Sequence, residues 1–175
     1  MPTEQDKTTA ALRFAIQMEI DGKVFYARAS QESQNPLGQK LLARLSEAED
    51  YHRLKFEQIY DSIRRALGWP RTDFQADHGR SLRTIFAREL EKKPAQVKPL
   101  KSELDAVQKA IEMEAKSYDF YHDRSEQVGS GPEKDFYETV KAEEREHQLV
   151  LNDYHEYMTN PAAWFVKTER QAIDG

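Results

Sequence analysis

A glutamate followed three positions later by a histidine occurs twice in this chain, at Glu49 and His52 and again at Glu144 and His147. Side chains three residues apart on an α-helix lie on one face, about one turn from each other, so each pair presents a carboxylate and an imidazole together. The two pairs are 95 residues apart. That separation is also the period of an internal repeat.

The repeat extends beyond the two pairs. The segments that align at this shift are 15–19 with 110–114 and 25–26 with 120–121. A single glutamate precedes each Glu-x-x-His pair by 30 residues, Glu19 in the first half and Glu114 in the second. The repeat therefore predicts two similar helix pairs, each of which contributes one lone glutamate and one Glu-x-x-His pair.

The composition suits long helices in one domain and excludes several function classes. The 175 residues can bury a core, and 33% charged residues with only seven glycines and seven prolines are typical of helices with solvated outer faces. The net charge of −5 argues against a nucleic-acid partner, and the lack of cysteine excludes disulfides, thiolate metal sites and cysteine nucleophiles. Because the N-terminus is polar and no apolar run reaches the length of a membrane span, we expect a single cytoplasmic domain over residues 1–175 with no membrane partner.

Apolar residues recur at intervals of three and four along four segments of the chain. This spacing predicts amphipathic helices at about 8–34, 37–67, 102–127 and 132–159. Prolines and glycines mark short links within each pair, so the paired helices are expected to be antiparallel neighbours. The predicted fold class is an all-α four-helix bundle of two antiparallel helix pairs.

The connection between the two pairs, residues 68–101, is too long for a turn between bundle neighbours. It predicts a crossover to the opposite end of the bundle, with a short helical stretch over 82–90. The chain closes with a tail over 160–175. We expect its Trp164 and Phe165 to pack on the domain or on a neighbouring subunit.

The six repeated residues fall inside the apolar faces of the predicted helices, so four helices each bring one carboxylate to the core. A buried, ionised carboxylate is costly unless it is paired or coordinates a metal. Two divalent ions balance four carboxylates, and each imidazole adds a neutral nitrogen ligand. We therefore predict a dinuclear metal site with the ligands Glu19, Glu49, His52, Glu114, Glu144 and His147. Ligands of this kind without thiolate favour iron or manganese over structural zinc, although the composition of the site does not exclude zinc.

A purely structural interpretation of these residues competes with the metal site. One Glu-x-x-His pair on a charged helix occurs by chance, and a lone glutamate or histidine near a core is ordinarily hydrogen-bonded or in contact with solvent. The shared period and core register of all six residues favour the metal site. We expect surface positions for the other three histidines, His78, His122 and His155. We expect a solvated face for the nearby acids Glu47, Asp50, Glu112, Glu143 and Glu146.

Three further assignments keep alternatives open. Glu112 and Glu143 have a second interpretation, as acids outside the ligand set or along an access path to it. Tyr26 and Tyr121 each follow the lone glutamate of their half by seven residues, two turns along the same face. Each phenol either donates a hydrogen bond to a ligand carboxylate or is a core aromatic with its hydroxyl satisfied elsewhere.

The pattern of Glu19, Glu49-x-x-His52, Glu114 and Glu144-x-x-His147 resembles the ferritin-like di-iron carboxylate proteins. Over nearly the whole chain it is most similar to short rubrerythrin-like proteins that lack a rubredoxin domain. The supporting motifs are Glu19-x-x-Gly22-x-x-Phe25-Tyr26 and Asn160-Pro161-x-x-Trp164-Phe165. The resemblance implies a ferritin-like bundle in which Glu49 and Glu144 bridge two irons. It also implies that Glu19 with His52, and Glu114 with His147, complete the two coordination shells.

The resemblance implies an oxidoreductase that reduces hydrogen peroxide or O2 as Fe(II) is oxidised. The chain departs from full-length rubrerythrins because it has no cysteine for a rubredoxin domain, so we expect an external electron donor such as a rubredoxin. It also has Ile111 where rubrerythrins carry a further glutamate one turn before Glu114. The alternatives are a ferroxidase that stores or delivers iron and a metal-free helical interaction module. We expect a homodimer or a higher homo-oligomer.

Overall fold

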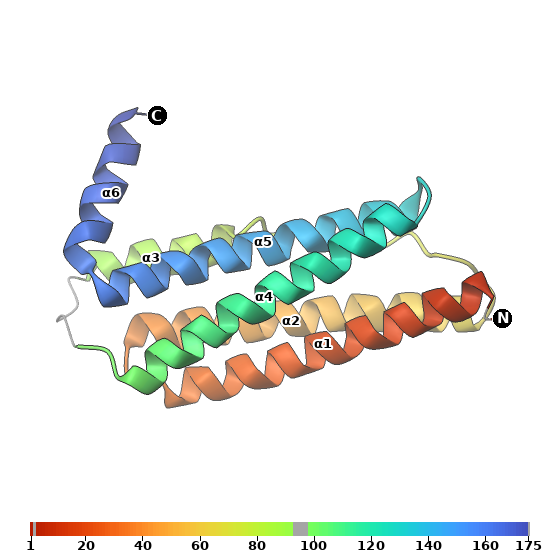
Figure 1. The fold of residues 1–175 in the computed structure, drawn as a ribbon, viewed down its shortest axis with the longest axis horizontal. Coiled ribbons are helices and arrows are strands. Elements are labelled where there is room, and N and C mark those ends of the chain that lie inside the picture. Colours follow the sequence, from red (N-terminus) through yellow and green to blue (C-terminus); the bar gives the residue numbers. More distant parts are fainter. Residues whose placement is uncertain (2, 93–97, 175) are drawn as a thin grey trace.

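The computed structural model describes residues 1, 3–92 and 98–174, and the regular structure within these ranges is helical (Figure 1). The helices are α1 (Glu4–Glu32), α2 (Pro36–Arg64), α3 (Arg80–Glu91), α4 (Lys101–Gln127), α5 (Pro132–Thr159) and α6 (Pro161–Asp174). The all-α prediction is confirmed, and the four predicted long helices are α1, α2, α4 and α5, with ends within four residues of the expected ones. Among the described residues, none of the helices combines the length and apolar character that a bilayer span requires.

Local sequence explains where the first two helices begin. The Thr3 hydroxyl accepts a hydrogen bond from the Asp6 N–H at 3.1 Å, and the Asp6 carboxylate accepts one from the Thr3 N–H at 2.8 Å. This capping box starts α1 earlier than the apolar spacing alone indicates. At α2, the Asn35 side chain caps the helix and Pro36 occupies its first turn, where a missing N–H has no consequence.

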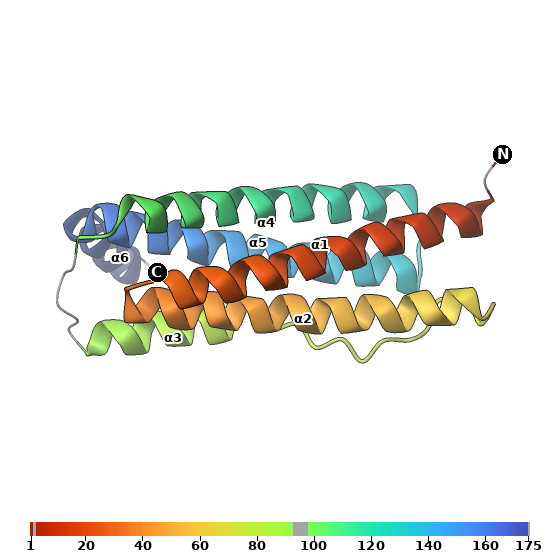
Figure 2. The same cartoon turned by 90° about the horizontal axis from the view of Figure 1, so that it is seen from below.

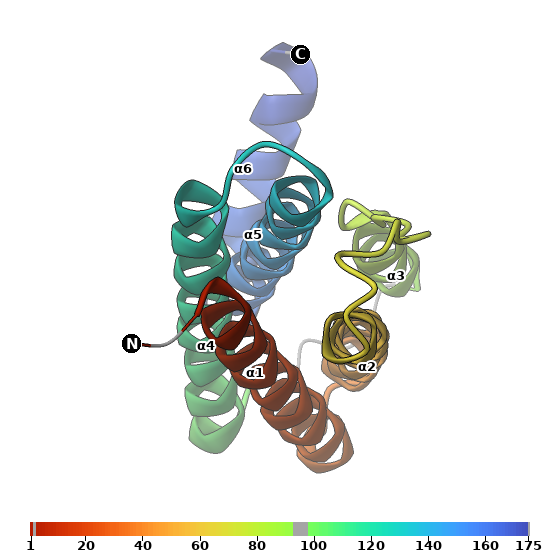
Figure 3. The same cartoon turned by 90° about the vertical axis from the view of Figure 1, so that its right-hand side faces the viewer.

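The four long helices form two antiparallel pairs that face each other. α1 packs on α2 and α4 packs on α5, while the pairs meet through α1 with α4 and α2 with α5. Seen along the bundle, these four helices surround a common centre, and α3 lies outside against α2 and α5 (Figure 3). The side view shows the segment after α2 returning along the bundle, so that α4 starts at the end opposite to the end of α2 (Figure 2). The predicted crossover is confirmed, apart from residues 93–97, which lie outside the described residues.

The apolar interior has two parts separated along the bundle axis. One cluster includes Leu41, Leu45 and Leu151, and it extends under α3 and the start of α6. The other cluster includes Leu12 and Phe56 and lies towards the opposite end of the bundle. Along each long helix, the predicted polar residues fall between members of these two clusters.

The tail is an ordered helix, α6, rather than an irregular segment. Its Trp164 is 9% exposed, and the indole packs against Phe86 of α3 and Tyr157 of α5, with ring centroids 5.2 and 5.7 Å apart. Packing on the domain is thus confirmed for Trp164, whereas Phe165 remains 42% exposed. The rest of α6 projects away from the bundle (Figure 1).

Candidate metal centre

Each long helix places one carboxylate in the layer between the two apolar clusters. α2 and α5 also place a histidine there, one turn after the glutamate. The residues are Glu19 on α1, Glu49 and His52 on α2, Glu114 on α4, and Glu144 and His147 on α5. None of the six is more than 4% exposed. The structure therefore brings together all six residues that the repeat singled out.

The ligand atoms of these residues form two groups, and within each group all atoms lie within 4.8 Å of one another. The first group is Glu19, Glu49, His52 and Glu144, and the second is Glu49, Glu114, Glu144 and His147. Two glutamates, Glu49 and Glu144, belong to both groups. This layout suits two ions that share two carboxylates. The assignment of Glu49 and Glu144 as bridges stays a prediction.

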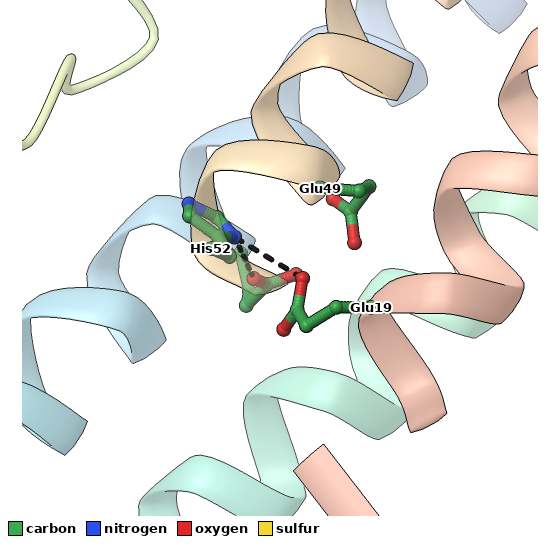
Figure 4. Close-up of side chains that lie close together, drawn as sticks. Glu19, Glu49 and His52 are labelled. Atoms are coloured by element: carbon green, nitrogen blue, oxygen red, sulfur yellow. Dashed lines mark ion pairs between the residues drawn. The ribbon is translucent and has the colours of Figure 1, made fainter. Parts of the chain in front are cut away.

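The histidine rings aim one nitrogen at the carboxylates. His52 Nδ1 lies 3.4 Å from Glu19 Oε2 and 3.2 Å from Glu144 Oε1, and Figure 4 shows the ring directed towards Glu19, with Glu49 nearby on the same helix. The equivalent distances of His147 Nδ1 are 3.5 Å to Glu49 Oε1 and 3.5 Å to Glu114 Oε2. The two imidazoles stack with centroids 5.7 Å apart and an interplanar angle of 13°. Each nitrogen is thus placed to complete the donor set of one group.

Two tyrosines tie the halves of the bundle together at this layer. Tyr26 of α1 donates a hydrogen bond to Glu114 of α4, and Tyr121 of α4 donates one to Glu19 of α1. Both phenols are buried. Of the two interpretations of these tyrosines, the structure supports the hydrogen bond to a carboxylate of the cluster. Each bond crosses between the repeats, so each phenol orients the lone glutamate of the other half.

The cluster leaves an unusual set of buried atoms without hydrogen-bond partners. Among the described residues, seven such atoms belong to the six candidate ligands: Glu19 Oε2, Glu49 Oε1, His52 Nδ1, Glu114 Oε2, Glu144 Oε1 and Oε2, and His147 Nδ1. Buried polar groups in folded proteins are nearly always paired, because an unpaired one costs about 1–3 kcal/mol. Every one of these atoms has a lone pair that a cation can accept. The donor set therefore fits two metal ions.

Packing these acids together without a cation shifts the pKa values of several groups in the cluster. Burial, followed by the charges of the neighbouring glutamates, raises the pKa of Glu49 and of Glu144 well above the usual value. The pKa of His147 is raised well above its usual value because Glu114 and Glu49 outweigh the opposing effect of burial. The metal-free cluster therefore holds protons that bound cations would displace.

Gly22 makes room for one of the shared glutamates. A Cβ atom added at this position of α1 would lie 2.8 Å from Glu49 Oε2 and 3.3 Å from Glu49 Cδ. Such contacts are too short, so any larger residue would push the carboxylate away. The sequence signal for this role is a glycine on the core face of a long helix, where glycine is otherwise unfavourable.

One expectation for the neighbouring acids is wrong. Glu143 is 3% exposed rather than solvated, because the crossover packs over it and the His78 N–H donates a hydrogen bond to its carboxylate at 2.7 Å. It lines a cavity of about 520 Å³ that also touches His52 and His147. This position matches the second interpretation of Glu143, as an acid along an approach to the site. The remaining lining mixes polar and apolar side chains, and its charged members include Arg44 and Asp77.

The other singled-out residues stay away from the cluster, as expected. His78 and His122 are exposed, and His155 is partly exposed. Glu47 and Glu112 are exposed, and Asp50 and Glu146 are half-buried in ion pairs with basic side chains. These residues offer no ligand atom to the two groups.

Comparison with known proteins agrees with this geometry. A family model described as Rubrerythrin matches residues 10–155 of the chain. The chain belongs to the rubrerythrin family. Rubrerythrins are ferritin-like di-iron carboxylate proteins, and this member has the glutamate and histidine cluster that could hold metal. No curated protein and no solved structure matches the chain significantly.

Proposed function

We propose that this rubrerythrin-family chain is a non-haem di-iron oxidoreductase that reduces hydrogen peroxide, or O2, as Fe(II) is oxidised. The observation that carries the proposal is the pair of four-residue groups that share Glu49 and Glu144. When bound there, two Fe(II) ions supply the two electrons that convert one hydrogen peroxide molecule and two protons into two water molecules. Such chemistry needs two ions held close together, and shared carboxylates are the means by which proteins achieve this.

The donor set favours iron. Four carboxylates neutralise two divalent ions, and they continue to stabilise the centre as its charge increases on oxidation. Imidazole suits iron and other first-row metals, whereas the thiolates that favour structural zinc are impossible in a chain without cysteine. Each group contains four donor residues among those the structure describes, so an ion held there could also bind a small oxidant.

The chain's own side chains orient the ligands and control approach. Tyr26 and Tyr121 hold one oxygen of Glu114 and of Glu19, leaving Oε2 of each glutamate for a cation. Gly22 gives Glu49 its position beside α1. The cavity next to the two histidines is large enough for a small, water-like oxidant to approach the site.

The direct test is anaerobic loading with Fe(II), followed by one equivalent of hydrogen peroxide. We expect the loaded protein to consume peroxide faster than the same iron free in buffer. The Glu144→Gln variant, which keeps the shape of a shared ligand but removes its charge, should lose most of this rate. Consumption by the parent no faster than by free iron would overturn the peroxidase proposal.

Iron storage is the competing function within the same family chemistry. Mineral storage requires a closed shell or an enclosing compartment, whereas peroxide reduction needs only the centre itself. Sedimentation and iron analysis after aerobic loading separate the two functions. We expect a small oligomer that retains about two irons per chain, as the two ligand groups imply. A large shell that retains many irons per chain would favour storage.

A further inference from the structure

On one side of the bundle, oxidisable aromatic side chains contact one another in a line that leads outward from the candidate metal centre. Tyr121, which donates its hydrogen bond to Glu19, stacks on Tyr137 of α5 with ring centroids 6.2 Å apart. Tyr137 in turn contacts Trp69, with centroids 5.7 Å apart. Three side chains that can each lose one electron therefore form an unbroken line from a candidate ligand.

The line reaches the surface of the protein. Tyr121 and Tyr137 are fully buried, whereas Trp69, in the connection after α2, is partly exposed. Its indole lines a surface hollow of about 340 Å³ between the first residues of α1 and the last residues of α2. A small molecule or a partner side chain seated in this hollow would touch the outer end of the line.

The other half of the repeat lacks this continuation. Tyr26 is the counterpart of Tyr121, but among the described residues its aromatic neighbour is Phe25, which is not readily oxidised. The position equivalent to Tyr137 in the first half is Leu42. The halves match at the ligands and at the phenols that bond them, and they differ at the next residue outward. The aromatic line is therefore a departure from the repeat and not a consequence of it.

We propose that Tyr121, Tyr137 and Trp69 form a route by which single electrons from an external one-electron reductant reach the centre. The proposal rests on the function proposed above and names where its electrons enter. It also names the class of partner: a one-electron reductant that binds at the hollow beside Trp69.

The chemistry of the three side chains fits sequential transfer. When the centre can supply only one of the two electrons that a peroxide molecule needs, Tyr121 would supply the second. Its phenol proton moves along the existing hydrogen bond to the Glu19 carboxylate, leaving a neutral phenoxyl radical. An electron from Trp69 then refills Tyr121 by way of Tyr137, and the proton returns from Glu19 to the phenolate oxygen. The indole is left as a radical cation, which keeps its N–H proton, and the external reductant restores it with one electron.

Tyr137 passes electrons between its two neighbours but does not form a stable radical. Its hydroxyl is buried and has no hydrogen-bond partner among the residues that the structure describes, so it has no acceptor there for the proton that a stable phenoxyl radical must lose. The guanidinium of Arg124 lies 5.8 Å from the centre of its ring and opposes a positive charge there. An oxidised state on Tyr137 therefore passes on to one of its two neighbours.

A first test uses the iron-loaded protein without any added reductant. With one Fe(II) per chain, the centre is one electron short for each peroxide molecule, so peroxide should withdraw that electron from the route, and mass spectrometry should find oxidised Trp69. Measured per bound iron, this oxidation should be lost in Tyr121→Phe and in Tyr137→Phe. Tyr26→Phe removes the equivalent hydrogen bond to Glu114 and should disturb the centre as Tyr121→Phe does, but it should keep the Trp69 oxidation per bound iron. Equal Trp69 oxidation in Tyr121→Phe and Tyr26→Phe would overturn the route.

A second test needs no metal, so it separates the route from the peroxidase function. In a Trp164→Phe background Trp69 is the only tryptophan, and a photogenerated ruthenium(III) complex in solution oxidises it. Transient absorption should show the indole radical decay as a tyrosyl radical grows at the same rate. Tyr121→Phe should lose that tyrosyl growth, Tyr137→Phe should slow it, and Tyr26→Phe should leave it unchanged. Growth that is unchanged in Tyr121→Phe overturns the route even in a protein that reduces peroxide.

Discussion

At the scale of single residues, the two shared glutamates of the metal-free protein lie in surroundings that disfavour their charged forms. Both are buried among other carboxylates, which raises their pKa values well above the usual range. Among the described residues, three of their four carboxylate oxygens have no hydrogen-bond partner: Glu49 Oε1, Glu144 Oε1 and Glu144 Oε2. Their position is unfavourable for folding alone, and a bound cation is the partner that makes it favourable.

Glutamine at either shared position should therefore have opposite effects on the metal-free and the metal-loaded protein. For Glu49→Gln and Glu144→Gln we expect metal-free stability to be unchanged or higher by on the order of 1 kcal/mol, because glutamine removes the cost of either burying the charge of that carboxylate or protonating it. Metal affinity should fall at least tenfold, about 1.4 kcal/mol of the stabilisation by Fe(II). Thermal unfolding with and without Fe(II) measures both effects. Full metal-induced stabilisation in both variants would show that neither glutamate is shared between two ions.

Gly22→Ala tests the close approach of α1 to Glu49. Alanine favours a helix interior by about 0.5–1 kcal/mol over glycine, so helix propensity alone predicts a more stable protein. The added methyl group would instead displace Glu49 Oε2, which lies 2.8 Å from the new Cβ. We expect lower metal affinity, measured by competition with a chelator. Gly129→Ala is the control, since its Cβ would meet no atom of the described residues within 4 Å. Equal affinities in both variants would contradict this role for Gly22.

At the scale of elements, the four long helices, the crossover and the meeting of the candidate ligands follow from the sequence, whereas the contacts that the crossover makes do not. The spacing of apolar residues and the 95-residue repeat predicted which helix faces are buried, because apolar residues recur regularly along the buried side of a helix. The burial of Glu143 could not be predicted, since it depends on which helix face the irregular segment before α3 covers. The hydrogen bond from the His78 N–H joins residues 65 positions apart in the chain. The aromatic contact between Trp69 and Tyr137 has the same origin.

The hydrogen bond that joins the crossover to α5 leads to a prediction for Glu143. Glu143→Ala removes the acceptor of the His78 N–H and should destabilise the protein by about 1–3 kcal/mol. Glu143→Gln keeps a carbonyl oxygen as acceptor and should recover most of that loss. Urea unfolding of the metal-free forms measures the difference. Equal stability of the alanine and glutamine variants would mean that this bond does not hold the crossover.

At the scale of the whole molecule, two apolar clusters enclose one polar layer, so the stability of the metal-free protein should depend on pH. Folded-state pKa values of Glu49 and Glu144 lie well above the unfolded value of 4.5, and that of His147 lies well above 6.5. For groups with raised folded pKa values, stabilisation is fully present below the unfolded pKa and is lost as pH rises through the folded pKa. Glu114 has a lowered pKa, and its opposite effect belongs to more acidic pH.

We therefore expect the metal-free protein to lose stability as pH rises from about 5 to about 8. Urea unfolding in the presence of a chelator gives the slope, and Glu144→Gln should flatten it because one titrating group is gone. Saturating Fe(II) should reverse the trend, since bound metal excludes the protons and is favoured as they leave. A metal-free protein whose stability rises over this range would contradict the proton-holding cluster.

The central claim is that one polar layer holds two metal ions between four helices, and anomalous X-ray diffraction at the iron edge tests it most directly. Crystals of the Fe(II)-loaded protein should show two peaks in this layer. One should lie beside Glu19 and His52 and the other beside Glu114 and His147, with the carboxylates of Glu49 and Glu144 reaching both. A single peak, or peaks only outside this layer, would contradict the dinuclear centre.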